Sequence, residues 1–181
     1  MDSLPYYFNL LNTKFREKAL FQIGRGNFYE NKFREAITNL DILLLEFPNS
    51  QYLEEGLLMK GECLVQLGNL DQAIETYRLI LQQNKNNVWT LFALTQLGTI
   101  YVFRNDSEQA EKVFHRVIEA FPHHPLFYHA SLQLGNLNYR QKNMVEAIHH
   151  YSMVLKGNLL ELLGQAYFGL GVIFYQQGKY E

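Results

Sequence analysis

The stretch GNLDQAIETY, from Gly68 to Tyr77, places a glycine and a polar turn before an alanine and an aromatic residue at helical spacing. The same arrangement occurs four times in the chain. The four segments align without gaps and read IGRGNFYENKFREAITNL from Ile23, KGECLVQLGNLDQAIETY from Lys60, LGTIYVFRNDSEQAEKVF from Leu97 and LGNLNYRQKNMVEAIHHY from Leu134. Self-similarity at a fixed period predicts a repeat architecture, in which stacked copies of one unit bury a continuous core.

Three positions of each segment carry the repeat. A glycine comes second, an alanine follows 12 residues later, and a large apolar residue follows after four more. The glycines are 37 residues apart: Gly24, Gly61, Gly98 and Gly135. The alanines are Ala36, Ala73, Ala110 and Ala147, and the large residues are Leu40, Tyr77, Phe114 and Tyr151. A fifth glycine, Gly171, follows 36 residues after Gly135, which indicates a further copy of the unit.

The spacing within a segment predicts a hairpin of two helices. Apolar residues three and four apart, such as Ile37, Leu40 and Leu44, mark one buried stripe on a helix. Small residues allow two helices to approach closely, so we expect the glycine of the first helix to face the alanine of the second. Residues 1–12, which include three aromatic residues, either extend the first helix or pack over its exposed end. We predict helices over residues 13–30, 33–46, 50–67, 70–83, 87–104, 106–120, 124–141, 143–156 and 159–177.

Local signals mark where these helices begin and end. Asn69 with Gln72 has the spacing of a capping box, with asparagine in place of serine or threonine. The same spacing recurs in Asn105 with Glu108 and in Asn143 with Glu146. Proline cannot continue the helical hydrogen-bond ladder, so Pro48 and Pro122 are expected to end the second helices of their repeats.

The composition excludes several classes of protein. The 181 residues are 48% hydrophobic and 19% charged, an ordinary balance for one folded domain with a substantial core. A formal net charge of −2 offers no general attraction for phosphates, so we expect no nucleic-acid partner. Cys63 is the only cysteine, which excludes an intrachain disulfide and a thiolate metal cluster. We interpret it as a small buried hydrophobic residue and not as a nucleophile.

One apolar stretch, Leu159 to Tyr175, invites comparison with a membrane span. It is shorter than the ~20 apolar residues that a spanning helix requires, and Glu161 and Gln165 interrupt it. We therefore interpret it as a buried helix and expect no membrane span. The first residues, MDSLPYYFNLLNTK, lack the basic segment and long apolar core of a secretory signal.

Residue types that carry chemistry do not form a recognisable site. Five of the six histidines fall into two clusters: His123, His124 and His129, and the adjacent His149 and His150. Neither spacing places three imidazoles on one helical face, so we interpret these side chains as solvated and expect no metal. The sequence also contains no nucleophile elbow and no glycine-rich phosphate loop. We expect no cofactor and no enzyme activity.

With the glycine at position 8, the four segments resemble the tetratricopeptide repeat family. Its pattern of ~34 residues combines a leucine–glycine pair, an aromatic, an alanine, a second aromatic and a closing proline. The third repeat matches it best, with Leu97, Gly98, Tyr101, Ala110, Phe114, Val117 and Pro122. The departures are Lys60 in place of leucine, Lys85 and Leu159 in place of proline, and Asn27 and Asn138 in place of an aromatic. The resemblance covers Lys18 to Glu181.

The resemblance implies an all-α fold, a right-handed superhelical α-solenoid of stacked antiparallel helix pairs. We expect a single domain over residues 1–181 that is a piece of a larger protein, with repeats at 17–50, 51–87, 88–124 and 125–160 and a truncated fifth at 161–181. The spacing of 37 is similar to that of the bacterial envelope branch of the family. That similarity implies the periplasm or cell envelope, and the cytoplasm stays open as the alternative.

By the same resemblance, the first helix of each repeat lines a concave groove that binds a peptide or a partner helix. Aromatic rings supply contact area there, and Arg25 or Arg140 could pair with a carboxylate. Any single ring can equally pack between neighbouring first helices. The expected partner-binding residues are Phe21, Arg25, Phe28, Tyr29, Leu58, Glu62, Gln66, Phe92, Thr99, Phe103, His129, Asn136, Tyr139, Arg140, Phe168 and Tyr175.

Two functions stay open at this point. The first is a non-catalytic protein–protein interaction scaffold, serving assembly of the bacterial envelope or of a multiprotein complex. The second is a self-association module whose main partner is another copy. Because the fifth repeat has only its first helix, we expect the apolar face of residues 159–175 to lack its cover and to form a homodimer through that end.

Overall fold

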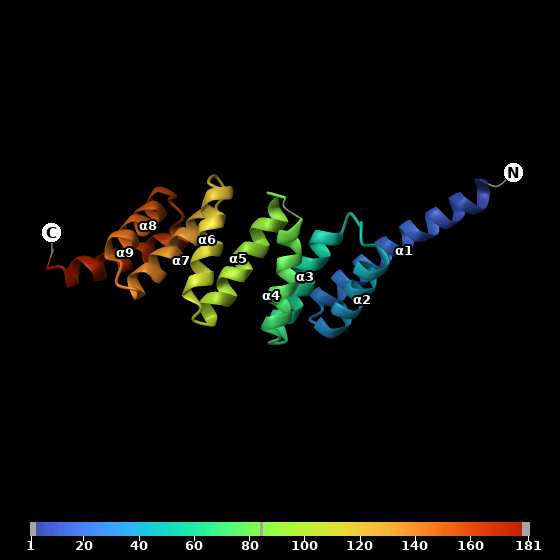
Figure 1. The fold of residues 1–181 in the computed structure, drawn as a ribbon, viewed down its shortest axis with the longest axis horizontal. Helices are drawn as coiled ribbons and strands as arrows, with labels where there is room; N and C mark the ends of the chain where they lie inside the picture. The colour runs from blue at the N-terminus through green and yellow to red at the C-terminus, as the bar shows by residue number, and fades with distance from the viewer. Residues whose placement is uncertain (1–2, 84, 179–181) are drawn as a thin grey trace. The chain divides into compact units, whose positions relative to one another are not determined.

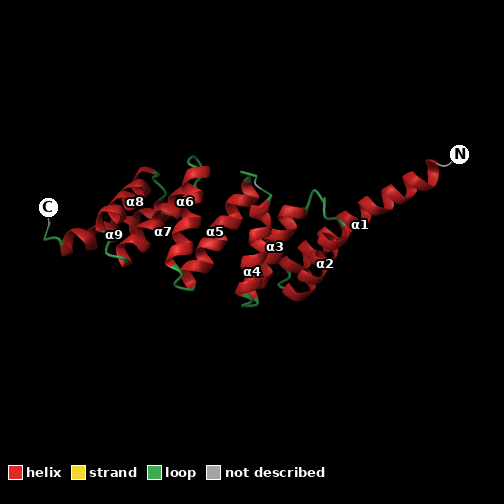
Figure 2. Cartoon of the chain, viewed as in Figure 1, coloured by secondary structure: helices red, strands yellow, loops and turns green. Residues whose placement is uncertain are grey.

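A computed structural model describes residues 3–83 and 85–178, and in this part of the chain every regular element is an α-helix (Figures 1 and 2). The helices are α1 (Ser3–Tyr29), α2 (Phe33–Glu46), α3 (Leu53–Gln66), α4 (Leu70–Gln82), α5 (Val88–Phe103), α6 (Ser107–Ala120), α7 (Leu126–Arg140), α8 (Met144–Lys156) and α9 (Leu160–Gln176). These nine helices of the described residues, joined by short turns, confirm the predicted all-α helical repeat solenoid.

Two helices begin at residues other than the predicted ones, which were 13 and 50. The backbone of α1 is helical from Ser3, so residues 3–12 continue the first helix, which was one of the two expectations. The side chains of the aromatic residues in that stretch lie outside the described ones. Helix α3 begins at Leu53, later than expected, because the chain first forms two turns. The Ser50 amide donates to the Phe47 carbonyl at 2.9 Å, and the Leu53 amide donates to the Ser50 carbonyl at 3.1 Å.

The chain divides into two compact units. The first ends at Ala93 and the second begins at Leu94, so the division falls within α5. In the first unit α1 packs against α2 and α3 against α4, and α2 and α3 join the two hairpins (Figure 1). In the second unit α7 packs against α6, α8 and α9, and α8 also contacts α9. The single domain over residues 1–181 stays a prediction.

A residue with left-handed backbone ends the first helix of each of the four aligned repeats. The four residues lie 37 apart, with φ values of 59°, 76°, 57° and 65° at Asn31, Gly68, Asn105 and Lys142. In the second repeat the Gly68 amide donates to the Val65 carbonyl at 3.0 Å, and the Asn69 amide donates to the Leu64 carbonyl at 2.8 Å. This pair of bonds is a Schellman motif, which satisfies carbonyl groups at the end of a helix.

The expected asparagine capping boxes are wrong. Asn69 and Asn143 are the N-cap residues of α4 and α8, but their side chains make no capping hydrogen bond. Asn105 is the left-handed turn residue, and Asp106 caps α6 by accepting from the Gln109 amide at 3.2 Å. Asparagine is tolerated in left-handed turns as well as favoured at N-caps, so the spacing alone could not separate the two roles.

The closest neighbour of the repeat glycine is the large residue of the second helix and not the alanine. A Cβ atom built on Gly98 would lie 2.5 Å from the ring of Phe114, and one built on Gly135 would lie 2.7 Å from the ring of Tyr151. The four alanines are fully buried beside these contacts: Ala36, Ala73, Ala110 and Ala147. The glycine therefore makes room for a ring or, at Gly24, for the side chain of Leu40, and the carbonyl oxygen of Ala36 also lies 3.7 Å from a Cβ atom built on Gly24.

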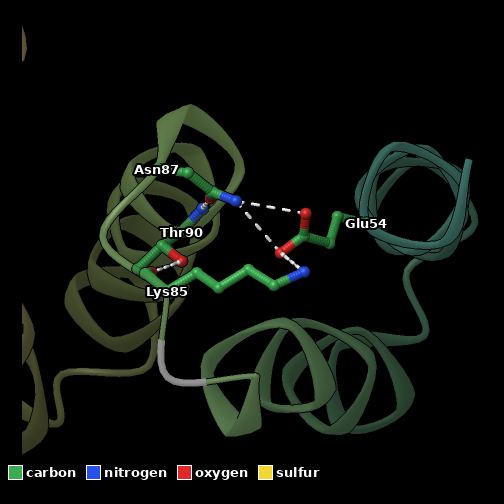
Figure 3. A network of polar contacts seen from close by, with 4 residues as sticks. All are labelled: Glu54, Lys85, Asn87 and Thr90. Carbon is green, nitrogen blue, oxygen red and sulfur yellow. Dashed lines mark hydrogen bonds and ion pairs between the residues drawn. The ribbon is translucent and has the colours of Figure 1, made fainter. Parts of the chain in front are cut away.

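Polar contacts secure the connection from α4 to α5, where the repeat has Lys85 instead of proline (Figure 3). The carboxylate of Glu54 on α3 accepts from Asn87 Nδ2 at 3.1 Å and lies 3.5 Å from Lys85 Nζ. Asn87 Oδ1 accepts from the Thr90 amide at 3.0 Å, and the Thr90 hydroxyl donates to the Lys85 carbonyl. Side chains thus anchor the start of α5 within the first compact unit.

Candidate partner-binding surface

The sixteen expected binding residues differ widely in exposure. Phe21 and Leu58 are only 1% and 8% exposed, so both belong to the core and offer no open face to a partner. Six are partly buried: Arg25, Phe28, Glu62, His129, Asn136 and Tyr139. Eight are exposed: Tyr29, Gln66, Phe92, Thr99, Phe103, Arg140, Phe168 and Tyr175.

In the first compact unit, α1 carries a group of aromatic side chains. The ring of Phe21 stacks on Tyr52 at 4.4 Å between centroids, which explains its burial. The guanidinium of Arg25 lies 5.7 Å from the centroid of the same Phe21 ring, a cation–π contact. One turn further on, Phe28 meets Tyr29 edge to face at 5.5 Å, and Tyr29 itself is 72% exposed. The structure thus brings an arginine and an open ring together on one helix.

In the second compact unit, hydrogen bonds connect the expected residues of α7 with its neighbours. The Tyr151 hydroxyl of α8 donates to Asn136 Oδ1 at 2.8 Å. Gln176 Nε2 of α9 donates to the Tyr139 hydroxyl at 3.0 Å. Burial, followed by the nearby Tyr139, raises the pKa of Tyr151. Arg140 remains exposed at the end of α7.

The second repeat contains a partly buried carboxyl group and a buried hydroxyl group. Glu62 of α3 is partly buried, and burial raises the pKa of its carboxyl group. The hydroxyl of Tyr77 on α4 is buried and has no hydrogen-bond partner. Burial, followed by the charge of Glu62, raises the pKa of Tyr77. Cys63 is fully buried, as predicted, and burial raises the pKa of its thiol to about 11.

Sequence reasoning missed the two tyrosine hydroxyls, although a signal was present. The large residue of the second helix is tyrosine in the second and fourth repeats and phenylalanine in the third. The residue that follows the repeat glycine is Glu62 or Asn136 where a tyrosine is present. In the third repeat it is Thr99, whose hydroxyl bonds to the Thr95 carbonyl of its own helix at 3.0 Å. A polar residue matched to a buried tyrosine could have indicated these pairs.

The interpretation of His150 as a solvated side chain is wrong. It is 4% exposed, and its ring meets His115 at 5.9 Å and His149 at 5.4 Å between centroids. Its Nδ1 atom is buried without a hydrogen-bond partner. Burial, followed by the charges of His149 and His115, lowers the pKa of His150 to about 4. Among the residues that the structure describes, no group of three or more histidine, cysteine or acidic side chains is placed to hold a metal ion.

Helix α9 is buried on one side only, so the expectation of a buried helix is half right. Leu162, Ala166, Leu170 and Ile173 form its buried side. Its other faces expose large apolar side chains: Leu160, Tyr167, Phe168, Phe174 and Tyr175. A Cβ atom built on Gly171 would meet nothing within 4 Å, whereas the equivalent glycines of the other repeats are covered. No described helix combines the length and the apolar character that a membrane crossing requires.

Comparisons with known proteins agree on the repeat. Models described as tetratricopeptide repeat match residues 18–50, 53–123 and 95–158. No curated protein matches the chain. The structure is similar to that of a tetratricopeptide repeat protein from Parabacteroides merdae, with 17% identity and a TM-score of 0.78. That alignment covers 91% of this chain and 61% of the other, so this chain spans less than two thirds of that protein.

Crystal structures of the protein MamA are similar as well. One is 21% identical with a TM-score of 0.71, and the alignment covers 87% of this chain and 85% of that one. Another is 20% identical with a TM-score of 0.72, covering 91% and 84%. At these levels of identity the likeness shows a shared fold.

Proposed function

Because the chain belongs to the tetratricopeptide repeat family, we propose that it is a non-catalytic protein–protein interaction scaffold that binds a peptide or a partner helix along its first helices. One observation carries the binding mode. Two aromatic residues at the same repeat position, Tyr29 on α1 and Phe103 on α5, are 72% and 77% exposed. Rings of this size contribute strongly to interfaces when a partner covers them, and exposed apolar groups often mark such sites.

Charged residues on the first helices of the repeats favour a polypeptide partner over a purely apolar one. Arg25 and Arg140 occupy α1 and α7, and Glu62 occupies α3. Arginine and aromatic side chains are the residue types that most often dominate protein interfaces. The spacing of 37 residues further supports a role in assembly of the bacterial envelope or of a multiprotein complex.

A selection for binding peptides tests the proposal. A displayed library of random peptides is selected on the wild-type chain, and the affinities of the enriched peptides are measured by fluorescence anisotropy. We expect Tyr29→Ala or Phe103→Ala to weaken binding at least tenfold. Leu45→Ala is the matched control, because Leu45 is an 83% exposed apolar residue on a second helix, α2. If Leu45→Ala lost as much affinity for the peptides as Tyr29→Ala and Phe103→Ala, the peptides would not bind specifically along the first helices.

Self-association is the second candidate, and the open face of α9 favours it. Tyr167 is 62% exposed beside Gly164 and Gly171, over which no side chain lies within 4 Å. A helix from a second copy could cover this face as second helices cover the other repeat glycines. Sedimentation equilibrium of the wild type and of Tyr167→Glu tests this idea. A wild-type monomer at high protein concentration removes self-association as a function.

A further inference from the structure

Glu62 is an acidic side chain on α3 for which the described residues provide no cation. It is partly buried, and it takes part in no ion pair and no hydrogen bond among those residues. Burial alone accounts for the raised pKa of its carboxyl group, and no basic group opposes that effect. Arg25, at the equivalent position of α1, lies over the ring of Phe21 instead. The two opposite charges are therefore present on neighbouring first helices without neutralising each other.

A buried hydroxyl group belongs to the tyrosine that packs on the glycine before Glu62. Tyr77 is 0% exposed, and its hydroxyl has no hydrogen-bond partner. Its ring packs on Gly61, the residue that precedes Glu62. The ring therefore packs beside the segment of α3 that carries this carboxylate, and the charge of Glu62 contributes to the raised pKa of Tyr77. A buried hydroxyl without a partner is costly, so its presence here needs an explanation.

In the fourth repeat, the equivalent tyrosine hydroxyl has a hydrogen-bond partner. Tyr151 and Asn136 lie 74 residues after Tyr77 and Glu62, which is two repeats. There the tyrosine hydroxyl donates to the amide oxygen of Asn136 at 2.8 Å, across the repeat glycine. In that repeat the acceptor of the tyrosine hydroxyl is therefore an uncharged amide. In the second repeat Glu62 occupies the equivalent sequence position, and its charge remains without compensation.

We propose that Glu62 binds a lysine or arginine side chain of the partner peptide, with the Tyr77 hydroxyl donating to the same carboxylate in the complex. The inference rests on the proposed function, because it assigns the chemistry of one position on that surface. We choose a basic side chain as the occupant because its positive charge complements the negative charge of the Glu62 carboxylate. A partly buried carboxylate gains more from a cation than an exposed one does, because water screens the pair less. A basic side chain also has hydrogen-bond donors and no acceptor, which suits a carboxylate.

The test uses peptides from the selection described above, so the ligand is defined by its sequence. We expect the enriched peptides to share a lysine or arginine at one position. Replacing that residue by norleucine keeps the aliphatic chain and removes the charge, and it should weaken binding to the wild type at least tenfold. In Glu62→Gln the same replacement should change the affinity less than twofold. Glu75→Gln on the exposed side of α4 is the matched control and should keep the tenfold effect.

Tyr77→Phe gives a second, independent measurement. Its melting temperature should equal or exceed that of the wild type, while its affinity for the basic peptides should fall by at least threefold. A purely structural role of the hydroxyl would leave the affinity unchanged, and that result overturns the assignment of Tyr77.

The outcomes separate the inference from the function on which it rests. Peptides that depend on Tyr29 but show no charge preference at Glu62 overturn the inference and leave the scaffold function standing. Peptides that retain full affinity for Tyr29→Ala and Phe103→Ala, or a library that yields no binding peptide, overturn both.

Discussion

The ring of Tyr151 packs so closely on Gly135 that an added Cβ atom would lie 2.7 Å from its Cδ1 and Cε1 atoms. A Cβ atom added to Gly169 of α9 would likewise lie 2.5 Å from Cζ of the same ring. The ring is therefore in close contact with glycines of both α7 and α9. Close contacts of this kind explain why glycine, a residue with poor helix propensity, occupies the repeat positions Gly61, Gly98 and Gly135 within helices.

Gly135→Ala is expected to destabilise the chain, because the methyl group would have to displace the ring of Tyr151. Overpacking of this kind costs about 1–3 kcal/mol, more than the gain in helix propensity. Gly171→Ala is the matched control, since it occupies the equivalent position but meets nothing within 4 Å. That variant should be stabilised by ~0.5–1 kcal/mol. Urea denaturation measures both, and equal stabilisation of the two variants would mean that the ring is free to move.

The two buried tyrosines are expected to respond differently to loss of the hydroxyl. Tyr151→Phe removes the hydrogen bond to Asn136 and should cost about 0.5–1.5 kcal/mol. Tyr77→Phe removes a buried hydroxyl that has no partner, so the free energy of unfolding should stay the same or rise. The comparison of the two melting curves is the measurement. A loss of stability in Tyr77→Phe as large as that in Tyr151→Phe would show that Tyr77 has a partner in the free chain.

The order of the helices could be predicted because a single period governs the sequence. Gly98 and Phe114 recur with their equivalents at a spacing of 37, and packing two helices at each copy leaves little choice of fold. Details that depend on backbone conformation could not be predicted. The spacing of Asn105 predicts a cap, yet its φ is 57°, because asparagine suits both environments.

The candidate site was less predictable than the fold, because repeat position does not determine burial. Phe21 and Phe168 occupy the same position of the first and fifth repeats, yet they are 1% and 75% exposed. The difference arises from neighbours distant in sequence: Tyr52 covers Phe21. His150 was likewise missed because its burial depends on the packing of α8 and on the ring of His115, which no local pattern encodes.

Glu54 is expected to matter more for stability than its partner Lys85. The Glu54 side chain is 14% exposed and accepts from Asn87, whereas the Lys85 side chain is 56% exposed. Glu54→Ala should cost about 1–3 kcal/mol, because it leaves the Asn87 amide without this acceptor. Lys85→Ala should cost less than ~1 kcal/mol, because an exposed ion pair contributes little. Hydrogen exchange adds a local measurement: the Thr90 amide should exchange faster in Glu54→Ala, and unchanged exchange would contradict the anchoring of α5 by this network.

Protonation of His150 is expected to destabilise the second compact unit in acid. Its pKa is lowered to about 4 in the folded chain, chiefly by burial, whereas a histidine in an unfolded chain has a pKa of about 6.5. Between these values the unfolded chain binds a proton that the folded chain excludes, so the free energy of unfolding falls as the pH drops from about 6.5 to about 4. The loss amounts to at most ~3 kcal/mol.

Urea denaturation across this range of pH should show a smaller decline in the free energy of unfolding for His150→Leu than for the wild type. The exposed control, His123→Gln, should keep the wild-type decline. If the free energy of unfolding declined with pH in the same way for all three proteins, the acid sensitivity would arise from groups other than His150.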